Sequence, residues 1–239
     1  MPRPLRPIDD GLIYHVINRG NNGQKVFRKQ ADFQAFLASL VELKERKPFK
    51  LYGYCLLDNH FHLLLRPTDE ATISRIMQSL LISHTQRYHR SHRSGGHVWQ
   101  GRFKSPVIQN DVHLLTVLRY IEANPLRAKL VRRADKYPWS SYGVHGLGEE
   151  NELVDRLITY EELSPQAKTR QRKWAAKVHQ PLKEAELAGI RRSSASGLPF
   201  GNSAWVKRLS KRLGLDLTIR PRGRPKKAEV LSVGKQPKK

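Results

Sequence analysis

Two histidines, His60 and His62, are separated by one residue in the run His60-Phe-His-Leu-Leu-Leu-Arg66. Side chains alternate between the two faces of a strand, so both imidazoles point to one side while Phe61 points into the core on the other. Two imidazoles on one face can converge on a single divalent ion through their ring nitrogens. A pair of surface or hydrogen-bonded histidines fits the same spacing, and so short a motif also occurs by chance.

Tyr120 and Asn124 are four residues apart in Leu114-Leu-Thr-Val-Leu-Arg-Tyr-Ile-Glu-Ala-Asn-Pro125, so a helix would place both on one face, with His113 two turns earlier. A phenol beside a metal-bound phosphate is a competent nucleophile, because the ion neutralises the scissile phosphodiester. The Asn124 oxygen could complete the coordination of that ion. The alternatives are a half-buried packing tyrosine and an asparagine that caps the helix end, since the residue before a proline is biased away from helical geometry.

Hydrophobic periodicity predicts the elements that position these residues. Strands are expected at residues 12–18, 50–57, 60–66 and 102–109, with Asp58-Asn59 as a hairpin turn and Pro106 marking an edge or a bulge. Helices are expected at residues 31–46 and 71–93, and from Val112 until Pro125 interrupts the third. This β-α-β-β-α-β-α order resembles an α+β, ferredoxin-like sandwich with an extra helix, the one that carries Tyr120.

The charge of the chain points to nucleic acid. Its 239 residues include 44 Lys and Arg against 21 Asp and Glu, a net charge of +23. Such a charge concentrates phosphates near the protein, whereas 38% apolar residues argue against a disordered chain. Cys55 is the single cysteine, which excludes an internal disulfide and cysteine-rich zinc or redox sites. With no apolar run long enough for a membrane span and no signal peptide, we expect a cytoplasmic, nucleoid-associated protein.

The composition changes at residues 146–150, which predicts three parts: a domain at 1–148, a helical accessory region at 149–213 and a basic, disordered tail at 214–239. In the accessory region, residues 161–190 look mostly helical with a break at Pro181, Ser193–Gly197 separates them from the next helix, and that helix covers residues 202–213. The tail holds the run Arg220-Pro-Arg-Gly-Arg-Pro-Lys-Lys227, which resembles an AT-hook. Arg222 and Arg224 of that run would enter an A·T-rich minor groove. A generic basic tail is the alternative.

Five ordered segments carry a resemblance to a known family. They are His15-Val-Ile-Asn-Arg-Gly20, Leu56-Leu-Asp-Asn-His-Phe-His62, Trp99-Gln-Gly-Arg-Phe103, Tyr120-Ile-Glu-Ala-Asn-Pro125 and Trp139-Ser-Ser-Tyr142. In order and spacing they resemble the REP-associated tyrosine transposases, which belong to the single-tyrosine HUH endonucleases, over roughly residues 8–145. The resemblance implies a ferredoxin-like catalytic core, with Tyr120 as the nucleophile and His60, His62 and Asn124 as ligands of Mg²⁺ or Mn²⁺.

The reaction implied by the resemblance is the cleavage and rejoining of single-stranded DNA at REP-like hairpins through a 5′-phosphotyrosine. A scaffold that binds DNA without catalysis, and a phosphodiesterase that uses metal-bound water, are the rival hypotheses. The partner is then single-stranded and hairpin DNA, with no membrane, and the chain would act as a monomer or a homodimer.

Several further residues could hold DNA. Arg87, Arg90 and Arg93 form a basic stripe on the second helix, although a solvated helix end has the same composition. Asn18 and Arg19 begin a polar loop that could contact base edges or be a plain turn. Arg102 lies between Trp99 and Phe103, which could stack on unpaired bases or belong to the core. His15 could flank the site, whereas structural or solvent roles are expected for His84, His92, His97, His145 and His179.

Overall fold

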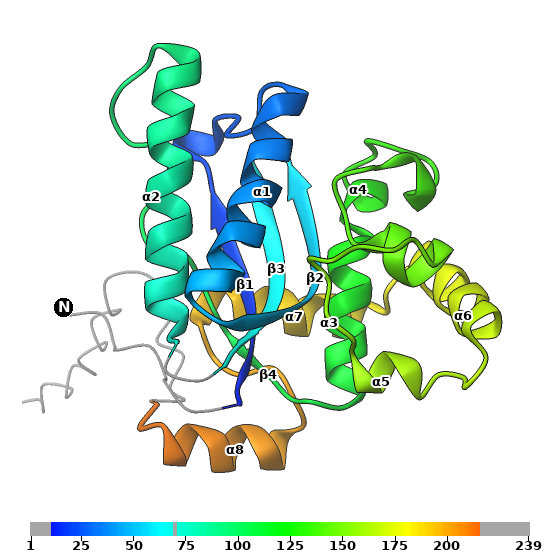
Figure 1. The fold of residues 1–239 in the computed structure, drawn as a ribbon. Coiled ribbons are helices and arrows are strands. Elements are labelled where there is room, and N and C mark those ends of the chain that lie inside the picture. Colours follow the sequence, from blue (N-terminus) through cyan, green and yellow to red (C-terminus); the bar gives the residue numbers. More distant parts are fainter. Residues whose placement is uncertain (1–10, 69–70, 216–239) are drawn as a thin grey trace, which may run out of the picture.

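A four-stranded antiparallel sheet forms the centre of the computed structural model, which describes residues 11–68 and 71–215. The strands are β1 (Ile13–Arg19), β2 (Phe49–Leu57), β3 (His60–Pro67) and β4 (Val107–Ile108), in the spatial order β2-β3-β1-β4 (Figure 1). The main helices are α1 (Gln30–Arg46), α2 (Ile73–His92), α3 (Val112–Glu122), α6 (Ala167–His179), α7 (Glu184–Ser196) and α8 (Ser203–Arg212). This order and pairing confirm the predicted ferredoxin-like α+β sandwich with an extra helix, α3.

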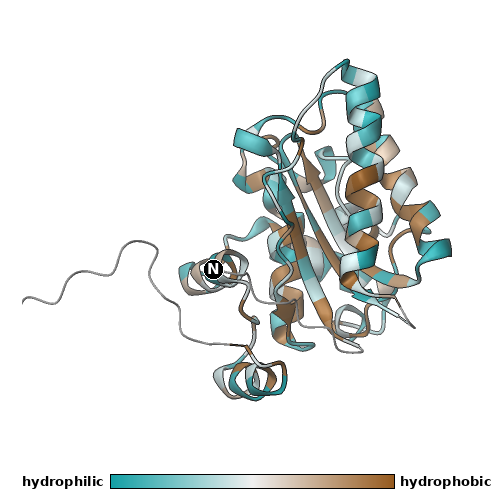
Figure 2. Ribbon diagram, turned by 90° about the vertical axis from the view of Figure 1, so that its left-hand side faces the viewer, coloured by the Kyte–Doolittle hydropathy of each residue, from teal (hydrophilic) through white to brown (hydrophobic). Residues whose placement is uncertain are grey.

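The two faces of the sheet are covered by different helices. Along β3, Phe61, Leu63 and Leu65 belong to the hydrophobic cluster beneath α1 and α2, whereas Leu64 belongs to the cluster beneath α3. Figure 2 shows the apolar residues on the strands and on the helix faces turned toward them. Each of these fully buried side chains contributes about 1.5–3 kcal/mol relative to an exposed one. The alternation expected for His60 and His62 therefore places both on the α3 side.

Helix α3 packs closely against β2, and Gly53 makes this approach feasible. A Cβ atom at Gly53 would lie 2.3 Å from the Leu118 side chain of α3. The helix begins where Asp111 accepts a hydrogen bond from the backbone N–H of His113, as an N-terminal cap does. A larger residue at position 53 would push away the helix that carries Tyr120.

The fourth strand is shorter than the predicted residues 102–109. Only Val107–Ile108 pairs as a regular strand with β1, although Lys104 exchanges both backbone hydrogen bonds with Ile17. Pro106 accepts a hydrogen bond from the N–H of His15 but has no N–H to return one, so the ladder is interrupted at this point. The prediction that Pro106 marks an edge is confirmed, because β4 lies at the edge of the sheet.

Two helix boundaries also differ from the predictions. Helix α3 ends at Glu122, and Asn124 and Pro125 open a separate turn, α4 (Asn124–Arg127), because proline is well suited to the first turn of a helix. Ser193–Ser196 do not separate two helices but complete α7, which ends at Gly197 with φ 80°. The break at Pro181 is confirmed between α6 and α7. Short turns that were not predicted are η1 (Asn21–Gly23), η2 (Ala134–Lys136), the π-type turn η3 (Gly143–Leu147) and α5 (Ile158–Glu161).

The predicted division at residue 148 stays a prediction. One hydrophobic cluster includes Leu118 of α3 together with Trp174 and Val178 of α6 and Ile190 of α7. The predicted accessory region therefore packs directly on the predicted first domain. The tail prediction, with Arg222 and Arg224, lies outside the described residues. Within the described ranges, no helix has both the length and the apolar character that crossing a membrane requires.

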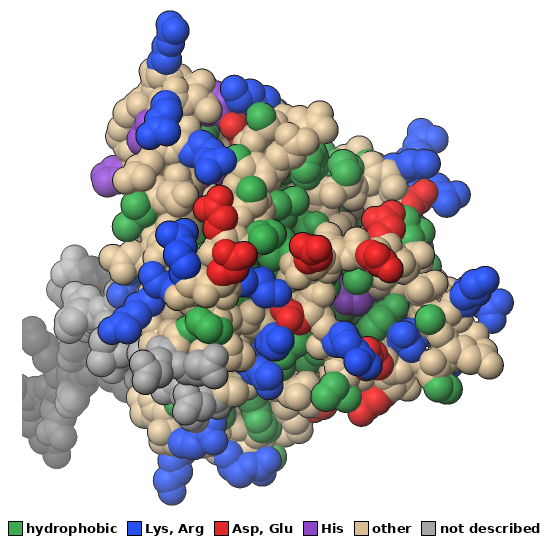
Figure 3. All heavy atoms as spheres, in the orientation of Figure 1, with side chains coloured by type: hydrophobic (Ala, Val, Ile, Leu, Met, Phe, Trp, Pro, Cys, Tyr) green, Lys and Arg blue, Asp and Glu red, His purple; other side chains and the backbone are tan. Residues whose placement is uncertain are grey.

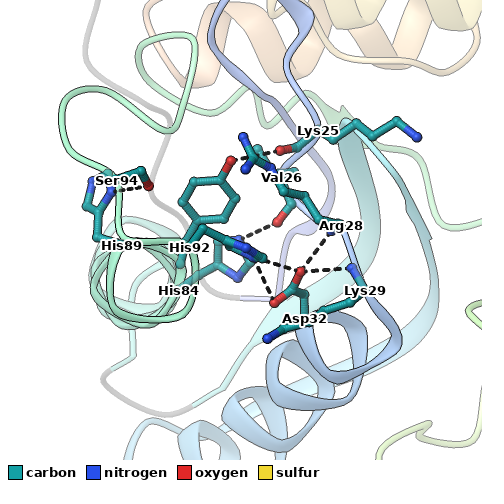
Figure 4. Close-up of polar contacts among 10 residues, drawn as sticks. Lys25, Val26, Arg28, Lys29, Asp32, His84, His89, His92 and Ser94 are labelled. Atoms are coloured by element: carbon teal, nitrogen blue, oxygen red, sulfur yellow. Dashed lines mark hydrogen bonds and ion pairs between the residues drawn. The ribbon is translucent and has the colours of Figure 1, made fainter.

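Most of the histidines without a predicted partner turn out to hold the fold together. His92 lies 3.0 Å from a carboxylate oxygen of Asp32, and the same oxygen accepts hydrogen bonds from the backbone N–H groups of Arg28 and Lys29 (Figure 4). His84 contacts the carbonyl of Val26 at 3.0 Å. These contacts fasten the C-terminal part of α2 to the start of α1, which supports the structural roles expected for His84 and His92.

Candidate active site

A cleft of about 520 Å³ opens on the α3 side of the sheet, where β1 ends and β3 begins. Strand β1 contributes Ile17, Asn18 and Arg19, and Asn59, His60 and His62 come from the start of β3. Tyr120 of α3 also lines the cleft, and α7 lies on the side of the sheet away from α1 and α2 (Figure 1). The remaining lining residues are Gln100, Arg102, Lys104, Arg191, Ser194 and Ala195. Residues from five separate segments therefore meet in one opening.

The histidine pair lies in this cleft on adjacent positions of one strand face. The ring centroids of His60 and His62 are 5.2 Å apart, and β1 pairs Arg19 with His60 and Ile17 with His62. Burial, together with the charges of Arg19 and Arg127, lowers the pKa of His60 to about 4. Burial, followed by neighbouring positive charges, holds the pKa of His62 well below its usual range. Both rings are therefore neutral at pH 7, the form in which a nitrogen lone pair can bind a metal.

Each ring of the pair uses one nitrogen inside the protein and leaves the other free. The Nδ1 atom of His60 lies 2.6 Å from the side-chain oxygen of Asn59, and Nδ1 of His62 lies 2.9 Å from Nε2 of His15. When Nδ1 of His62 carries the proton and donates it to His15, Nε2 of His62 has a free lone pair. Such a hydrogen bond orients a ligating histidine and raises its basicity. The two remaining Nε2 atoms are of the type that binds divalent transition-metal ions well.

His15 is a member of the site that the sequence suggested only as a flanking residue. It is fully buried on β1, stacks on His62 with centroids 5.1 Å apart, and meets the Tyr120 ring at 5.9 Å. Burial lowers its pKa to about 3, so it too is neutral. Its second ring nitrogen, Nδ1, is buried and has no hydrogen-bond partner in the described structure. The orienting contact on His62 therefore comes from a strand 47 residues earlier in the chain.

The Tyr120 ring lies beside the rings of His62 and His15. Its ring centroid is 5.7 Å from that of His62, and the Arg127 guanidinium lies over the Tyr120 ring at 3.9 Å. A cation placed at this distance over a ring is attracted to its face. Burial lowers the pKa of Arg127 from its usual value. Arg127 was not recognised from the sequence, because it lies beyond Pro125 in a separate turn and no local pattern places it over Tyr120.

Asn124 is placed differently from a free metal ligand. Its side-chain oxygen accepts a hydrogen bond from Nη2 of Arg127 at 2.6 Å, and its amide nitrogen donates to the Tyr120 carbonyl at 3.2 Å. In this arrangement Asn124 holds Arg127 over the tyrosine. The predicted third-ligand role stays a prediction, and it requires the oxygen to serve the ion as well as Arg127. Among the described residues, no group of three or more His, Cys, Asp or Glu side chains could hold a metal ion.

Cations surround the cleft, and none of the described residues that line it is a carboxylate. Arg19, Arg102, Lys104 and Arg191 supply the charges, and the expected contacts of Arg19 and Arg102 with DNA stay a prediction. Asn18 also lines the cleft, and its amide nitrogen is buried without a partner. On the face of the molecule that Figure 3 shows, by contrast, Asp and Glu are interspersed with Lys and Arg. The cleft is therefore the better surface for a phosphate backbone.

Other predicted site residues lie away from the cleft. Arg87 and Arg90 are exposed on α2, which covers the other face of the sheet, and Arg93 ends that helix with φ 45°. Phe103 is buried in the core, and Trp99 packs on Phe61 at 5.4 Å, so the core interpretation of this aromatic pair is the one observed. The structure does not bring the α2 arginines together with Tyr120.

A fully buried carboxylate anchors the helix that presents Tyr120. Glu122 accepts hydrogen bonds from Ser141 at 2.6 Å and from the indole N–H of Trp174 at 2.7 Å, and it lies 2.7 Å from Nδ1 of His145. These contacts join α3 to η3 and to α6. Two of the five sequence motifs meet at this carboxylate, because Glu122 belongs to the Tyr120–Pro125 segment and Ser141 belongs to the Trp139–Tyr142 segment.

A histidine pair on one strand thus faces a tyrosine on the extra helix of a ferredoxin-like sheet. Residues 10–124, just under half of the chain, match the family described as "Transposase IS200 like". A Haemophilus influenzae protein named "Putative REP-associated tyrosine transposase" is 26% identical over 118 residues, which cover 45% of this chain and 66% of that protein. The resemblance drawn from the five motifs is thereby confirmed.

A solved structure, "Structure of the REP associates tyrosine transposase bound to a REP hairpin", has the same fold. Its TM-score is 0.52 at 18% identity, and the match covers 66% of this chain and 99% of that one. The chain spans about two thirds of the length of the Haemophilus relative. Helix α7, which closes the cleft, lies outside the residues that match the family.

Proposed function

We propose that the protein cleaves and rejoins single-stranded DNA beside REP-like hairpins, with Tyr120 as the nucleophile. The observation that carries this proposal is the meeting of Tyr120, His60 and His62 in one cleft whose described lining includes cations and no carboxylate. The family and the two relatives support a transposase and, in the solved structure, a REP hairpin as the bound DNA.

The reaction needs only groups that the cleft contains and a divalent ion. The phenol oxygen of Tyr120 attacks the phosphorus, the phenol proton passes to solvent, and the bond to the 3′ oxygen breaks. That oxygen takes up a proton, which leaves a free 3′-OH and a 5′-phosphotyrosyl link. The attack of a 3′-OH on this link reverses the step and rejoins the strand, so no external energy source is required.

His60 and His62 would hold the ion, Mg²⁺ or Mn²⁺, which supplies neutralisation of the phosphate charge when bound. His15 orients His62 through their shared hydrogen bond. Arg127, held by Asn124 at 2.6 Å, keeps a positive charge over the Tyr120 ring. Arg19 and Arg102 lie where they can contact the incoming strand.

The covalent link provides the test. The parent protein, a Tyr120→Phe variant and a Tyr160→Phe control are incubated with a labelled hairpin oligonucleotide and Mn²⁺, and the products are run on a denaturing gel. We expect a protein–DNA adduct with the parent and the control and none with Tyr120→Phe, whose affinity for the hairpin should change less than about twofold because only one oxygen is removed. Cleavage without an adduct would indicate a water nucleophile. Binding without cleavage would indicate a scaffold that has lost catalysis.

A further inference from the structure

Helix α7 turns one face toward the candidate active site. Arg191, Ser194 and Ala195 line the cleft together, and their spacing of three and four residues places them on one side of the helix. Ile190 and Ser193 are buried instead, Ile190 in the cluster beneath α3 and Ser193 with its hydroxyl donating to the carbonyl of Leu198 at 2.6 Å. The lining face is thus free to contact a ligand.

The position of α7 is fixed relative to the helix that carries Tyr120. Nη2 of Arg119, the neighbour of Tyr120 on α3, donates to the carbonyls of Gln180 and Pro181 at 2.8 Å each, and Nη1 lies 4.0 Å from Glu186. Gly189 packs under the ring of Phe200, where a Cβ atom would lie 3.0 Å from the ring. Because α7 is attached to α3 through these contacts, its lining residues keep a defined place opposite the tyrosine.

The lining face of α7 has the chemistry of an anion site. No carboxylate lies within ion-pair distance of Arg191 among the described residues, and the cleft also holds Arg19, Arg102 and Lys104. The Ser194 hydroxyl oxygen is buried, and no described residue is a hydrogen-bond partner for it. An anion bound between these groups would accept a hydrogen bond from the unpaired buried hydroxyl and would reduce the repulsion among the unpaired positive charges.

We propose that Arg191 and Ser194 bind a backbone phosphate of the single strand that enters the cleft, so that α7 clamps the DNA against Tyr120. A guanidinium can donate two parallel hydrogen bonds to phosphate oxygens, and the serine hydroxyl supplies a third donor. This inference rests on the proposed function for its substrate, single-stranded DNA. Arg191 and Ser194 are positioning residues, and the C-terminal helical region becomes part of the substrate site.

The matched control is the neighbouring Arg192, which is exposed on the same helix and does not line the cleft. Full-length parent, Arg191→Ala, Arg191→Lys and Arg192→Ala proteins are titrated with a labelled single-stranded oligonucleotide in EDTA, at several salt concentrations. For Arg191→Ala we expect affinity about tenfold lower and a slope of log K against log salt reduced by about 0.7, the value for one lost phosphate contact. Arg191→Lys should recover part of the loss, and Arg192→Ala should change affinity less than about twofold. Equal losses for the two alanine variants, or no loss for Arg191→Ala, would overturn the proposal.

Neutral methylphosphonates at single positions of the oligonucleotide locate the contact. At one position the parent protein should lose affinity while Arg191→Ala, which no longer makes the contact, loses nothing further. Ser194→Ala should show its effect at the same position. If no position behaves in this way, the clamp does not exist.

Binding in EDTA requires no cleavage, which separates this proposal from the proposed function. A parent protein that forms no adduct but shows the Arg191 effect would refute the chemistry and support the clamp. If the parent forms an adduct but Arg191→Ala leaves the affinity unchanged, the proposed chemistry is supported and the clamp is refuted. Thermal unfolding of each variant at the parental temperature shows that the fold is unchanged.

Discussion

Glu122→Gln should be among the most damaging isosteric substitutions in the protein. The carboxylate is fully buried and accepts from Ser141 and Trp174, with His145 at 2.7 Å from the same oxygen as Ser141. Glutamine keeps the volume, so no cavity forms and the loss is purely polar. Its amide group has one acceptor oxygen and one NH₂ group, and the NH₂ group must face either Trp174 or the Ser141 side.

The magnitude follows from this conflict. Hydrogen bonds to a charged group contribute about 1.5–3 kcal/mol each, and at least one is lost in the amide. The donor left facing NH₂ is buried without a partner, which adds a further penalty of about 1 kcal/mol or more. We therefore expect Glu122→Gln to lower the free energy of unfolding by about 2–4 kcal/mol. For a chain of this size that is a fall in Tm of roughly 5–15 °C.

Urea unfolding of the full chain, followed by fluorescence, measures the loss. Glu42→Gln is the control, because Glu42 lies on the exposed side of α1 with its oxygen 3.9 Å from Arg46, and such surface pairs contribute less than about 1 kcal/mol. Trp174→Phe removes the donor that the amide would oppose, so the double variant should be more stable than the two single losses predict, by about 1 kcal/mol. A Glu122→Gln protein within 1 kcal/mol of the parent, or strict additivity in the double variant, would refute the reasoning.

Four further predictions concern the metal, the tail and pH. His60→Ala and His62→Ala should each remove most metal-dependent adduct while hairpin binding, measured in EDTA, stays intact; cleavage at the parental rate in limiting Mn²⁺ would disprove the metal site. His15→Phe should weaken Mn²⁺ binding about 10- to 100-fold in a direct titration, because His62 loses its orienting partner; unchanged affinity would show that His15 only packs. Deleting residues 214–239, which hold eight Lys and Arg against two acidic residues, should reduce the slope of log K against log salt by about two units if two or three of those cations touch phosphate, and an unchanged slope would mean that the tail does not contact DNA. Burial lowers the pKa of His84 to about 4 in the folded protein, whereas the same side chain in the unfolded chain takes up a proton near pH 6.5. The free energy of unfolding should therefore fall as the pH drops from 6.5 to 4, by up to about 1.4 kcal/mol per pH unit. His84→Phe should flatten this slope, as measured by urea titrations at each pH.

The order of elements could be predicted because it depends on local patterns. The alternation in His60–Arg66 and the helical spacing around Phe33 and Phe36 appear in the structure within a residue or two of the predicted bounds. The strand predicted at residues 102–109 is shorter in the structure, and the break predicted at residues 193–197 is helical up to Ser196. Both differences result from contacts between segments that are far apart in the chain. Pro106 cannot complete a ladder whose partner strand is 90 residues away, and the serines of α7 stay helical because that helix packs on α3.

The sequence by itself determined which side chains could do chemistry: a histidine pair on one strand face, a tyrosine on a helix, and a large excess of positive charge. These are properties of residue type and local period, and they were sufficient for the family. Only the tertiary structure decided what surrounds those groups. His15 reaches His62 across a strand pairing, Arg127 takes the oxygen of Asn124, and Arg191 arrives from a helix about 70 residues beyond Tyr120. Contacts between residues far apart in the chain leave no local periodicity, since they arise from the way the sheet and helices pack, and so they could be found only once the chain was folded.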